Sequence, residues 1–153
     1  LVHELGHYIV LRLLGTAPHV IRLELTGAVM YYDGRAMGYG GELAAAAAGP
    51  AAGAMLGALA ALCGDTALCG ASLTLTAFNL LPANGLDGGK MLHSILALLL
   101  DGDRADKVSD ILTIFTAAAL ILCGGAAFIG IRCGAALILA GAALLIRQLK
   151  GGR

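Results

Sequence analysis

The sequence contains little charge, and it has no excess of either sign. Of its 153 residues, 13% are Asp, Glu, Lys or Arg, and ten basic residues balance ten acidic ones. Nucleic-acid binding needs a basic face that neutralises phosphates, so this balance argues against a nucleic-acid partner. The sequence also lacks internal repeats and polar linkers. We therefore expect a single domain over residues 1–153.

Apolar residues make up 59% of the chain. This composition predicts an all-α polytopic membrane protein, a bundle of transmembrane helices in a lipid bilayer. Spans are expected at about 41–62, 71–100 and 108–147, the last holding two helices around a Gly-rich turn between Gly124 and Cys133. The chain starts without an initiator Met inside an apolar stretch, residues 1–14. We therefore expect a fragment whose first transmembrane helix is absent.

With these spans, nearly all basic residues lie on one side of the membrane, which the preference for basic cytoplasmic loops makes the cytoplasm. They are Arg12, Arg22, Arg35, Arg104, Lys107, Arg147, Lys150 and Arg153, with Arg132 on the other side. The expected location is therefore the cell membrane, in a multi-pass topology.

All four cysteines fall near the non-cytoplasmic ends of the predicted helices. They are Cys63, Cys69, Cys123 and Cys133. Disulfides are chemically permitted there, but small buried hydrophobic residues are the alternative that we favour. No pair has zinc-finger spacing.

The segment from Val20 to Gly41 breaks the helical pattern. Apolar and charged residues alternate from Ile21 to Leu25, and a turn signal follows at Asp33-Gly34. This pattern predicts a small membrane-associated β-hairpin. It is either a connector on the membrane surface or an edge that pairs with an extended substrate.

The strongest chemical signal is His3-Glu4-Leu5-Gly6-His7. Histidines at i and i+4 share one helix face, so both imidazoles can reach one metal ion, and the intervening Glu4 can act on its water. The alternative is two core histidines and a surface glutamate. The apolar character of this helix favours the metal-binding interpretation. Three ionisable groups within lipid are costly, and one metal ion would be a partner for all of them.

A catalytic zinc usually has three protein ligands, and Asp87 is the best candidate for the third. It lies in the interruption from Asn79 to Lys90, where Pro82 and several glycines should break the predicted 71–100 span at membrane depth. Alternatively, the stretch is a re-entrant or kinked helix with a capping Asp. Coordinating one dication would offset the desolvation of Asp87 and both histidines together.

These residues resemble the site-2 proteases, a family of intramembrane zinc metalloproteases. The resemblance covers most of the chain and rests on three motifs: His3-Glu4-Leu5-Gly6-His7, Ala48-Gly49-Pro50, and Asn79-Leu80-Leu81-Pro82 followed by Leu86-Asp87-Gly88-Gly89. It implies His3, His7 and Asp87 as ligands of one zinc ion per chain, Glu4 as the catalytic acid/base, and a six-helix core whose first helix is absent here.

The second motif has the spacing of the sporulation-type branch, with two departures. Asn84-Gly85 replaces the usual bulky residue and Pro, and Gly53 stands where Asn commonly follows Gly-Pro. Neither departure touches an expected ligand. They leave the branch and the fit of the substrate open.

The resulting hypothesis is an intramembrane zinc endopeptidase that cleaves a membrane-tethered protein. Asn79 and Lys90 are candidate donors to the oxyanion, although Lys90 is better explained by snorkelling to an interface. His93 is either a partner of the metal site or a satisfied core residue, and His19 is expected in a solvated loop. The alternative is a non-catalytic metal transporter or an inactive adaptor. A transporter should have more intramembrane acids and repeat symmetry.

Overall fold

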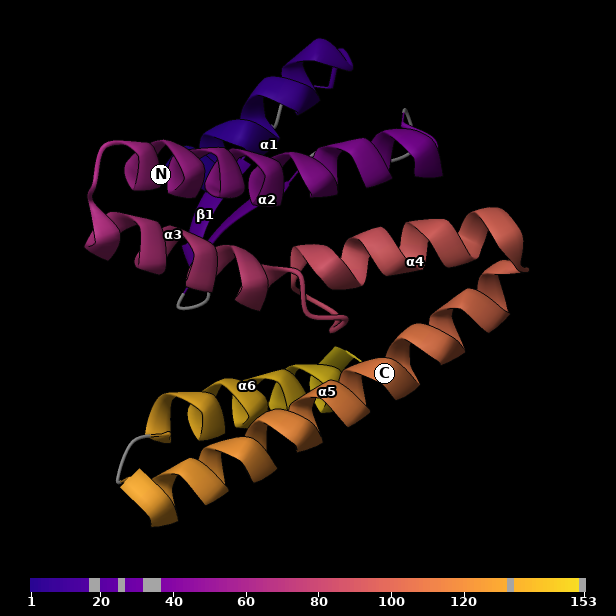
Figure 1. Ribbon diagram of the computed structural model, residues 1–153. Helices are drawn as coiled ribbons and strands as arrows, with labels where there is room; N and C mark the ends of the chain where they lie inside the picture. Colours follow the sequence, from indigo (N-terminus) through magenta and orange to yellow (C-terminus); the bar gives the residue numbers. More distant parts are fainter. Residues whose placement is uncertain (17–19, 25–26, 32–36, 132–133, 152–153) are drawn as a thin grey trace. The chain divides into compact units, whose positions relative to one another are not determined.

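The computed structural model describes residues 1–16, 20–24, 27–31, 37–131 and 134–151 (Figure 1). The elements in chain order are α1 (Val2–Leu13), β1 (Val20–Glu24), β2 (Gly27–Tyr31), α2 (Tyr39–Leu62), α3 (Thr66–Asn79), α4 (Asp87–Leu99), α5 (Gly102–Ile131) and α6 (Ala135–Gly151). Two compact units, Leu1–Leu80 and Leu81–Arg153, divide the chain, and each is described separately. The single-domain expectation stays a prediction.

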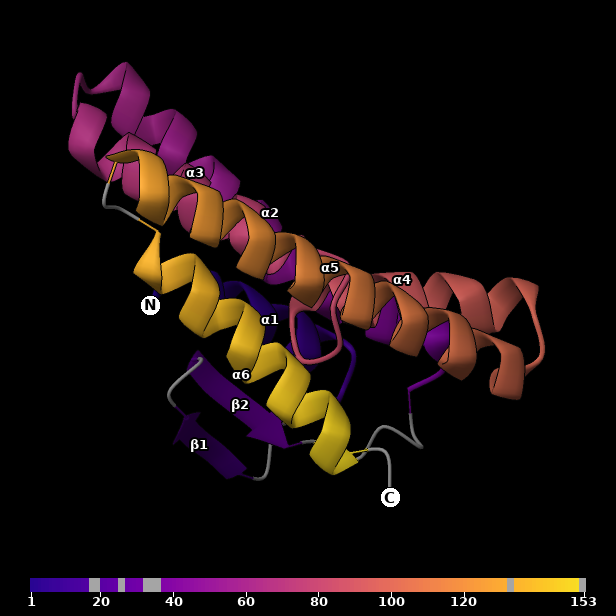
Figure 2. The same cartoon turned by 90° about the horizontal axis from the view of Figure 1, so that it is seen from below.

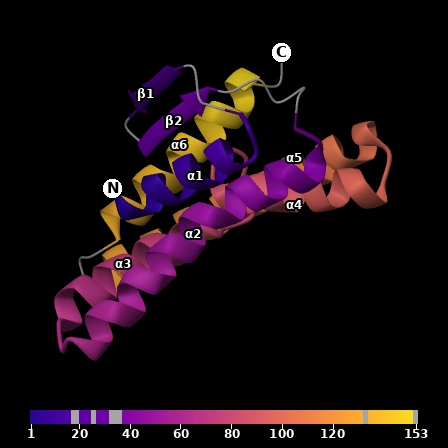
Figure 3. The ribbon, with the colours of Figure 1, turned by 90° about the horizontal axis from the view of Figure 1, so that it is seen from above.

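A stripe of small residues on α2 organises the first unit. Ala45, Gly49, Gly53 and Gly57 are all buried and follow one another at intervals of four residues, so they lie along one side of the helix. Helix α1 packs against α2 (Figure 3), where a Cβ on Gly6 would lie 2.8 Å from the Cβ of Ala52. Small residues of this kind let helix backbones approach closely in lipid.

The same stripe receives α3. Asp65 caps α3 by accepting a hydrogen bond from the Leu68 amide at 2.9 Å, and α3 runs back beside α2 (Figure 1). A Cβ on Gly53 would lie 2.5 Å from the Thr76 hydroxyl oxygen. A larger residue at position 53 would therefore require the Thr76 side chain to move.

The segment after α1 contains a two-stranded antiparallel sheet. The register runs from Val20 opposite Tyr31 to Glu24 opposite Gly27, and β1 and β2 lie side by side (Figure 2). The turn signal Asp33-Gly34 and the loop residue His19 lie outside the described residues.

The helix breaks where the sequence predicts it. Helix α3 ends at Asn79 and α4 begins at Asp87. Pro82 has no N–H to continue the helical hydrogen bonds, and Gly85 adopts φ +97°, a left-handed conformation that side chains disfavour. These two residues prevent a continuous helix over 71–100.

In the second unit, α5 and α6 form an antiparallel helical pair (Figure 2). The prediction of two helices within 108–147 is confirmed, and they separate at the end of the stretch predicted as a turn: α5 stays helical through Gly124 to Ile131, and α6 begins at Ala135. A Cβ on Gly124 would lie 2.8 Å from Ile138 Cγ1, and one on Gly141 would lie 2.7 Å from the Ala117 carbonyl oxygen. These glycines serve close packing of the helices rather than a turn.

Two of the described helices are long and apolar enough to cross a membrane, α2 over Tyr39–Leu62 and α5 over Gly102–Gly130. The other described helices have 17 residues or fewer. Among the described cysteines, Cys63 and Cys123 are exposed thiols and Cys69 is half-buried. The expectation that cysteines serve as small buried hydrophobic residues is therefore wrong for Cys63 and Cys123, and Cys133 lies outside the described residues.

Candidate metal centre

The first two turns of α1 bring two imidazoles together. His3 is 7% exposed, His7 is half-buried, and their Nε2 atoms lie 3.2 Å apart. The rings meet edge to face, with centroids 4.9 Å apart. The i and i+4 spacing in the sequence therefore produces a pair of nitrogens that converge on one point in space.

A carbonyl oxygen on α2 fixes the orientation of His7. The His7 Nδ1 atom lies 2.7 Å from the Ala45 carbonyl oxygen. A carbonyl can only accept, so Nδ1 carries the proton, and in the neutral ring Nε2 keeps its lone pair for a ligand. Such hydrogen bonds to the second ring nitrogen are usual for metal-bound histidines. Every residue has a backbone carbonyl, so the sequence cannot show which of them will accept the hydrogen bond from His7.

The lack of a side chain at Gly49 lets both imidazoles lie close against α2. A Cβ built on Gly49 would collide with His7 Nε2 and would lie 2.8 Å from His3 Nε2. Gly49 is buried in α2, one turn after Ala45. In the sequence Gly49 is part of the Ala48-Gly49-Pro50 motif, and the structure gives it a specific role: any side chain here would meet both imidazole nitrogens.

These residues fit a zinc ion. Two nitrogen ligands at about 2.0–2.1 Å from a tetrahedral zinc lie about 3.3 Å from each other. The observed separation of the His3 and His7 Nε2 atoms is 3.2 Å. Imidazole nitrogens suit zinc, and the missing side chain at Gly49 allows both of them to approach one point.

Gly49→Ala tests this fit. We expect the added methyl group to force the imidazoles apart and to lower zinc affinity by at least about 10-fold, the scale seen when the support of a metal ligand is lost. Gly70→Ala is the matched control, since a Cβ on Gly70, within α3, meets nothing within 4 Å. Titration with a chromogenic zinc chelator measures both variants. Wild-type affinity in Gly49→Ala would show that the missing side chain has no role in metal binding.

Glu4 and Asp87 lie in different units. Glu4 is half-buried in the first turn of α1, next to His3 in sequence. Asp87 is the first residue of α4 and is 5% exposed. The N-cap position belongs to Leu86, and no side chain caps this helix, so the alternative of a capping Asp is wrong. The role of Asp87 as the third ligand stays a prediction.

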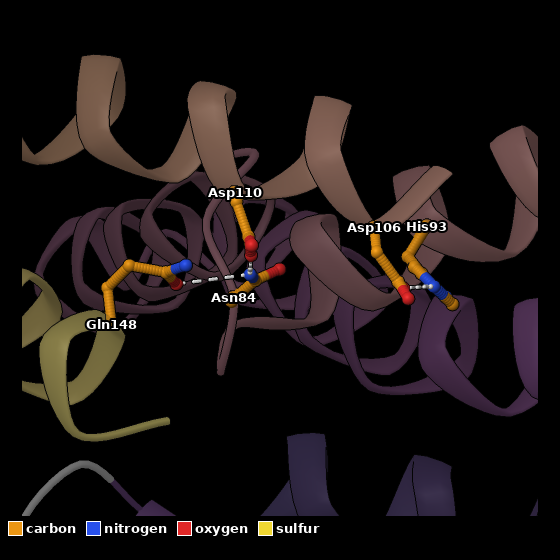
Figure 4. Close-up of polar contacts among 5 residues, drawn as sticks. All are labelled: Asn84, His93, Asp106, Asp110 and Gln148. Atoms are coloured by element: carbon orange, nitrogen blue, oxygen red, sulfur yellow. Dashed lines mark hydrogen bonds and ion pairs between the residues drawn. The ribbon is translucent and has the colours of Figure 1, made fainter. Parts of the chain in front are cut away.

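The other candidates have partners of their own. The Asn79 amide donates to the Leu75 carbonyl oxygen at 3.0 Å, one turn earlier in α3. Lys90 is 55% exposed, and its Nζ lies 3.6 Å from the Asp87 carboxylate. His93 Nε2 lies 2.8 Å from an Asp106 carboxylate oxygen, which joins α4 to α5 (Figure 4). His93 is thus a partly exposed, paired residue rather than a buried core histidine.

No protein-family model and no curated protein matches the sequence. Among solved structures, the chain is similar to the site-2 protease from Methanocaldococcus jannaschii, with a TM-score of 0.76 and 26% sequence identity. The similarity covers 99% of this chain and 73% of that protein. It therefore extends over both units and includes α1, which carries the paired histidines, and the broken stretch before α4.

Proposed function

From the membership of this chain in the site-2 protease family of membrane metalloproteases, we propose that it is an intramembrane zinc endopeptidase. Its substrate is a protein tethered to the membrane, cut in or near its transmembrane segment. The observation that carries the proposal is the 3.2 Å separation of the His3 and His7 Nε2 atoms, with His7 oriented by a backbone carbonyl. Both histidines lie one turn apart on α1, the helix that also carries Glu4.

In this proposal, Asp87 joins His3 and His7 as the third zinc ligand. A carboxylate that is 5% exposed in an apolar protein is costly unless positive charge compensates it. Lys90 supplies part of that charge at 3.6 Å but is itself 55% exposed. A dication shared with two imidazoles compensates the Asp87 carboxylate more fully, and three protein ligands leave the fourth position open for chemistry.

Glu4 moves the proton. A zinc ion held by these residues would supply Lewis acidity toward a peptide carbonyl and would make water easier to deprotonate. Glu4 accepts the proton of the attacking water and then delivers it to the leaving amine. Its place in the same turn as His3 keeps the carboxylate near the metal ligands, and its partial burial limits competition from bulk water.

For the developing oxyanion we propose Lys90 or Asn79 as an additional donor. The Asn79 amide already donates within α3. The Lys90 ammonium has three protons and pairs with one carboxylate oxygen of Asp87, so it retains donors for a substrate carbonyl. Of the two residues, Lys90 therefore has the greater free capacity to donate.

A transmembrane substrate must lose its helical hydrogen bonds before its carbonyls can be attacked. We propose that the β1–β2 sheet assists this step by pairing with the extended substrate. Within the described part of the chain the sheet has two strands, so each strand has one edge that no other described strand covers. We further propose a multi-pass topology with the site within the bilayer toward the cytoplasm.

Metal removal tests the proposal. A single-span test protein and the full chain are reconstituted in phosphatidylcholine vesicles, and cleavage is followed by electrophoresis. We expect a zinc chelator to abolish cleavage and added zinc to restore it, because attack on the peptide requires the metal. A chain that binds zinc stoichiometrically but never cleaves would instead indicate the non-catalytic alternative, a metal transporter or an inactive adaptor.

A further inference from the structure

The loop that precedes Asp87 is tied to α5 and α6 by the side chain of Asn84, one of the departures from the family motif. The Asn84 amide nitrogen Nδ2 donates to an Asp110 carboxylate oxygen at 2.8 Å and to the Gln148 side-chain oxygen at 3.2 Å (Figure 4). The Asn84 backbone N–H also donates to the Thr113 hydroxyl at 2.8 Å. One residue thereby links three segments of the second unit.

The part of α5 that receives the loop carries three polar side chains on one side. Asp110, Thr113 and Thr116 follow at intervals of three residues and so lie on one side of α5. Thr113 is fully buried, and Thr116 donates to the Pro82 carbonyl oxygen at 3.2 Å. The loop thus has three attachments to α5, and the spacing of these polar residues was the sequence signal that could have predicted them.

The anchored loop backbone in turn supports the first turn of α4. A Cβ on Gly89 would lie 3.0 Å from the Asn84 backbone nitrogen and would collide with the Ala83 carbonyl oxygen. Gly89 is two residues after Asp87 in the same helical turn. A shift of the Asn84 backbone would therefore displace the start of α4, including Asp87.

We propose that Asn84 is a positioning residue that holds Asp87 in the place from which it binds the metal. The inference rests on the proposed function, because it assumes that Asp87 is a zinc ligand. In this chain, Asn84-Gly85 replaces the bulky residue and proline usual in the family pattern. Hydrogen bonds to α5 and α6 supply the rigidity that a proline ring would give by fixing φ.

Exchanging donor and acceptor tests this role. Asn84→Asp places two carboxylates at a contact that measures 2.8 Å in the wild type, so the loop should detach from α5. We expect zinc release from the intact chain in detergent, followed with a chromogenic chelator, to accelerate by at least about 10-fold. Asp110→Asn keeps an oxygen acceptor and should change the release rate little.

The double variant Asn84→Asp/Asp110→Asn restores a donor opposite an acceptor, and Gln148 can turn its amide to donate. We expect it to bring the release rate back to within about 3-fold of the wild type, a rescue that general destabilisation would not give. Asp106→Asn is the matched control, since it weakens the His93 contact between α4 and α5 without touching the loop. It should release zinc at the wild-type rate.

Helix content by circular dichroism accompanies every variant, and Asn84→Ala replaces Asn84→Asp if the latter does not fold. Wild-type zinc release from a folded Asn84 variant, or a double variant that fails to recover, would overturn the positioning role. If the wild-type chain binds no zinc, the proposed function itself fails, and this inference fails with it. The two failures are therefore distinguishable.

Discussion

Glu4→Gln should abolish proteolysis while leaving zinc bound. Glutamine keeps the size of the side chain and its place in the first turn of α1, but it cannot accept a proton from water. General acid–base groups typically contribute about 100-fold to 10,000-fold to a rate, so we expect kcat for a reconstituted single-span substrate to fall by at least about 100-fold. Zinc content by elemental analysis should stay at one ion per chain in the variant.

The control for this substitution is Glu42→Gln. Glu42 is likewise half-buried in the first turn of a helix, α2, but it has no part in the proposed chemistry. Its variant should cleave at the wild-type rate. Undiminished turnover in Glu4→Gln would remove Glu4 from the mechanism, and loss of zinc in the same variant would make it a metal-site residue instead of a proton carrier.

Asp87→Ala should lose zinc. In the proposal it removes one of three protein ligands, and we expect zinc affinity to fall by at least about 100-fold, more than the loss of an indirect support would cost. Lys90, which is 55% exposed, can turn to water once Asp87 is replaced. Competition with a chelator of known affinity measures the change.

Asp101→Ala is the matched control for the loss of a carboxylate. Asp101 lies between α4 and α5, and its side chain is 85% exposed. Zinc affinity should be unchanged in this variant. If Asp87→Ala binds zinc as tightly as the wild type, the third ligand lies elsewhere in the chain, whereas His3 and His7 keep their assignment on their own geometry.

Local sequence signals predicted the parts of the candidate site that depend on neighbours along the chain. The pairing of His3 with His7 follows from the helix repeat alone, because residues four apart share a face. The break before Asp87 follows from a missing N–H at Pro82 and from the conformational freedom of Gly85. Both effects act within a few residues, so the sequence is sufficient to predict them.

The glycines show where local signals fail. Gly124 lies in a Gly-rich stretch that resembles a turn, yet it remains helical because its lack of a side chain admits α6. Asn84 interacts with residues 26 and 64 positions away, and the sequence does not show which segment will face it. In the sequence, a glycine or an asparagine looks the same whether it forms a turn, allows a close helix contact or makes a hydrogen bond.

The sequence by itself determined the chemistry available to this protein: two imidazoles and a carboxylate on one apolar helical turn, a second carboxylate after a broken helix, and the helical, membrane-type composition. Only the tertiary structure decided how the imidazoles are held. The Ala45 carbonyl that orients His7 is 38 residues away, and Gly49, whose lack of a side chain admits both imidazoles, lies in the same helix. The physical reason is that helix periodicity is a property of adjacent residues, whereas the packing of α2 on α1 depends on the shapes of both surfaces.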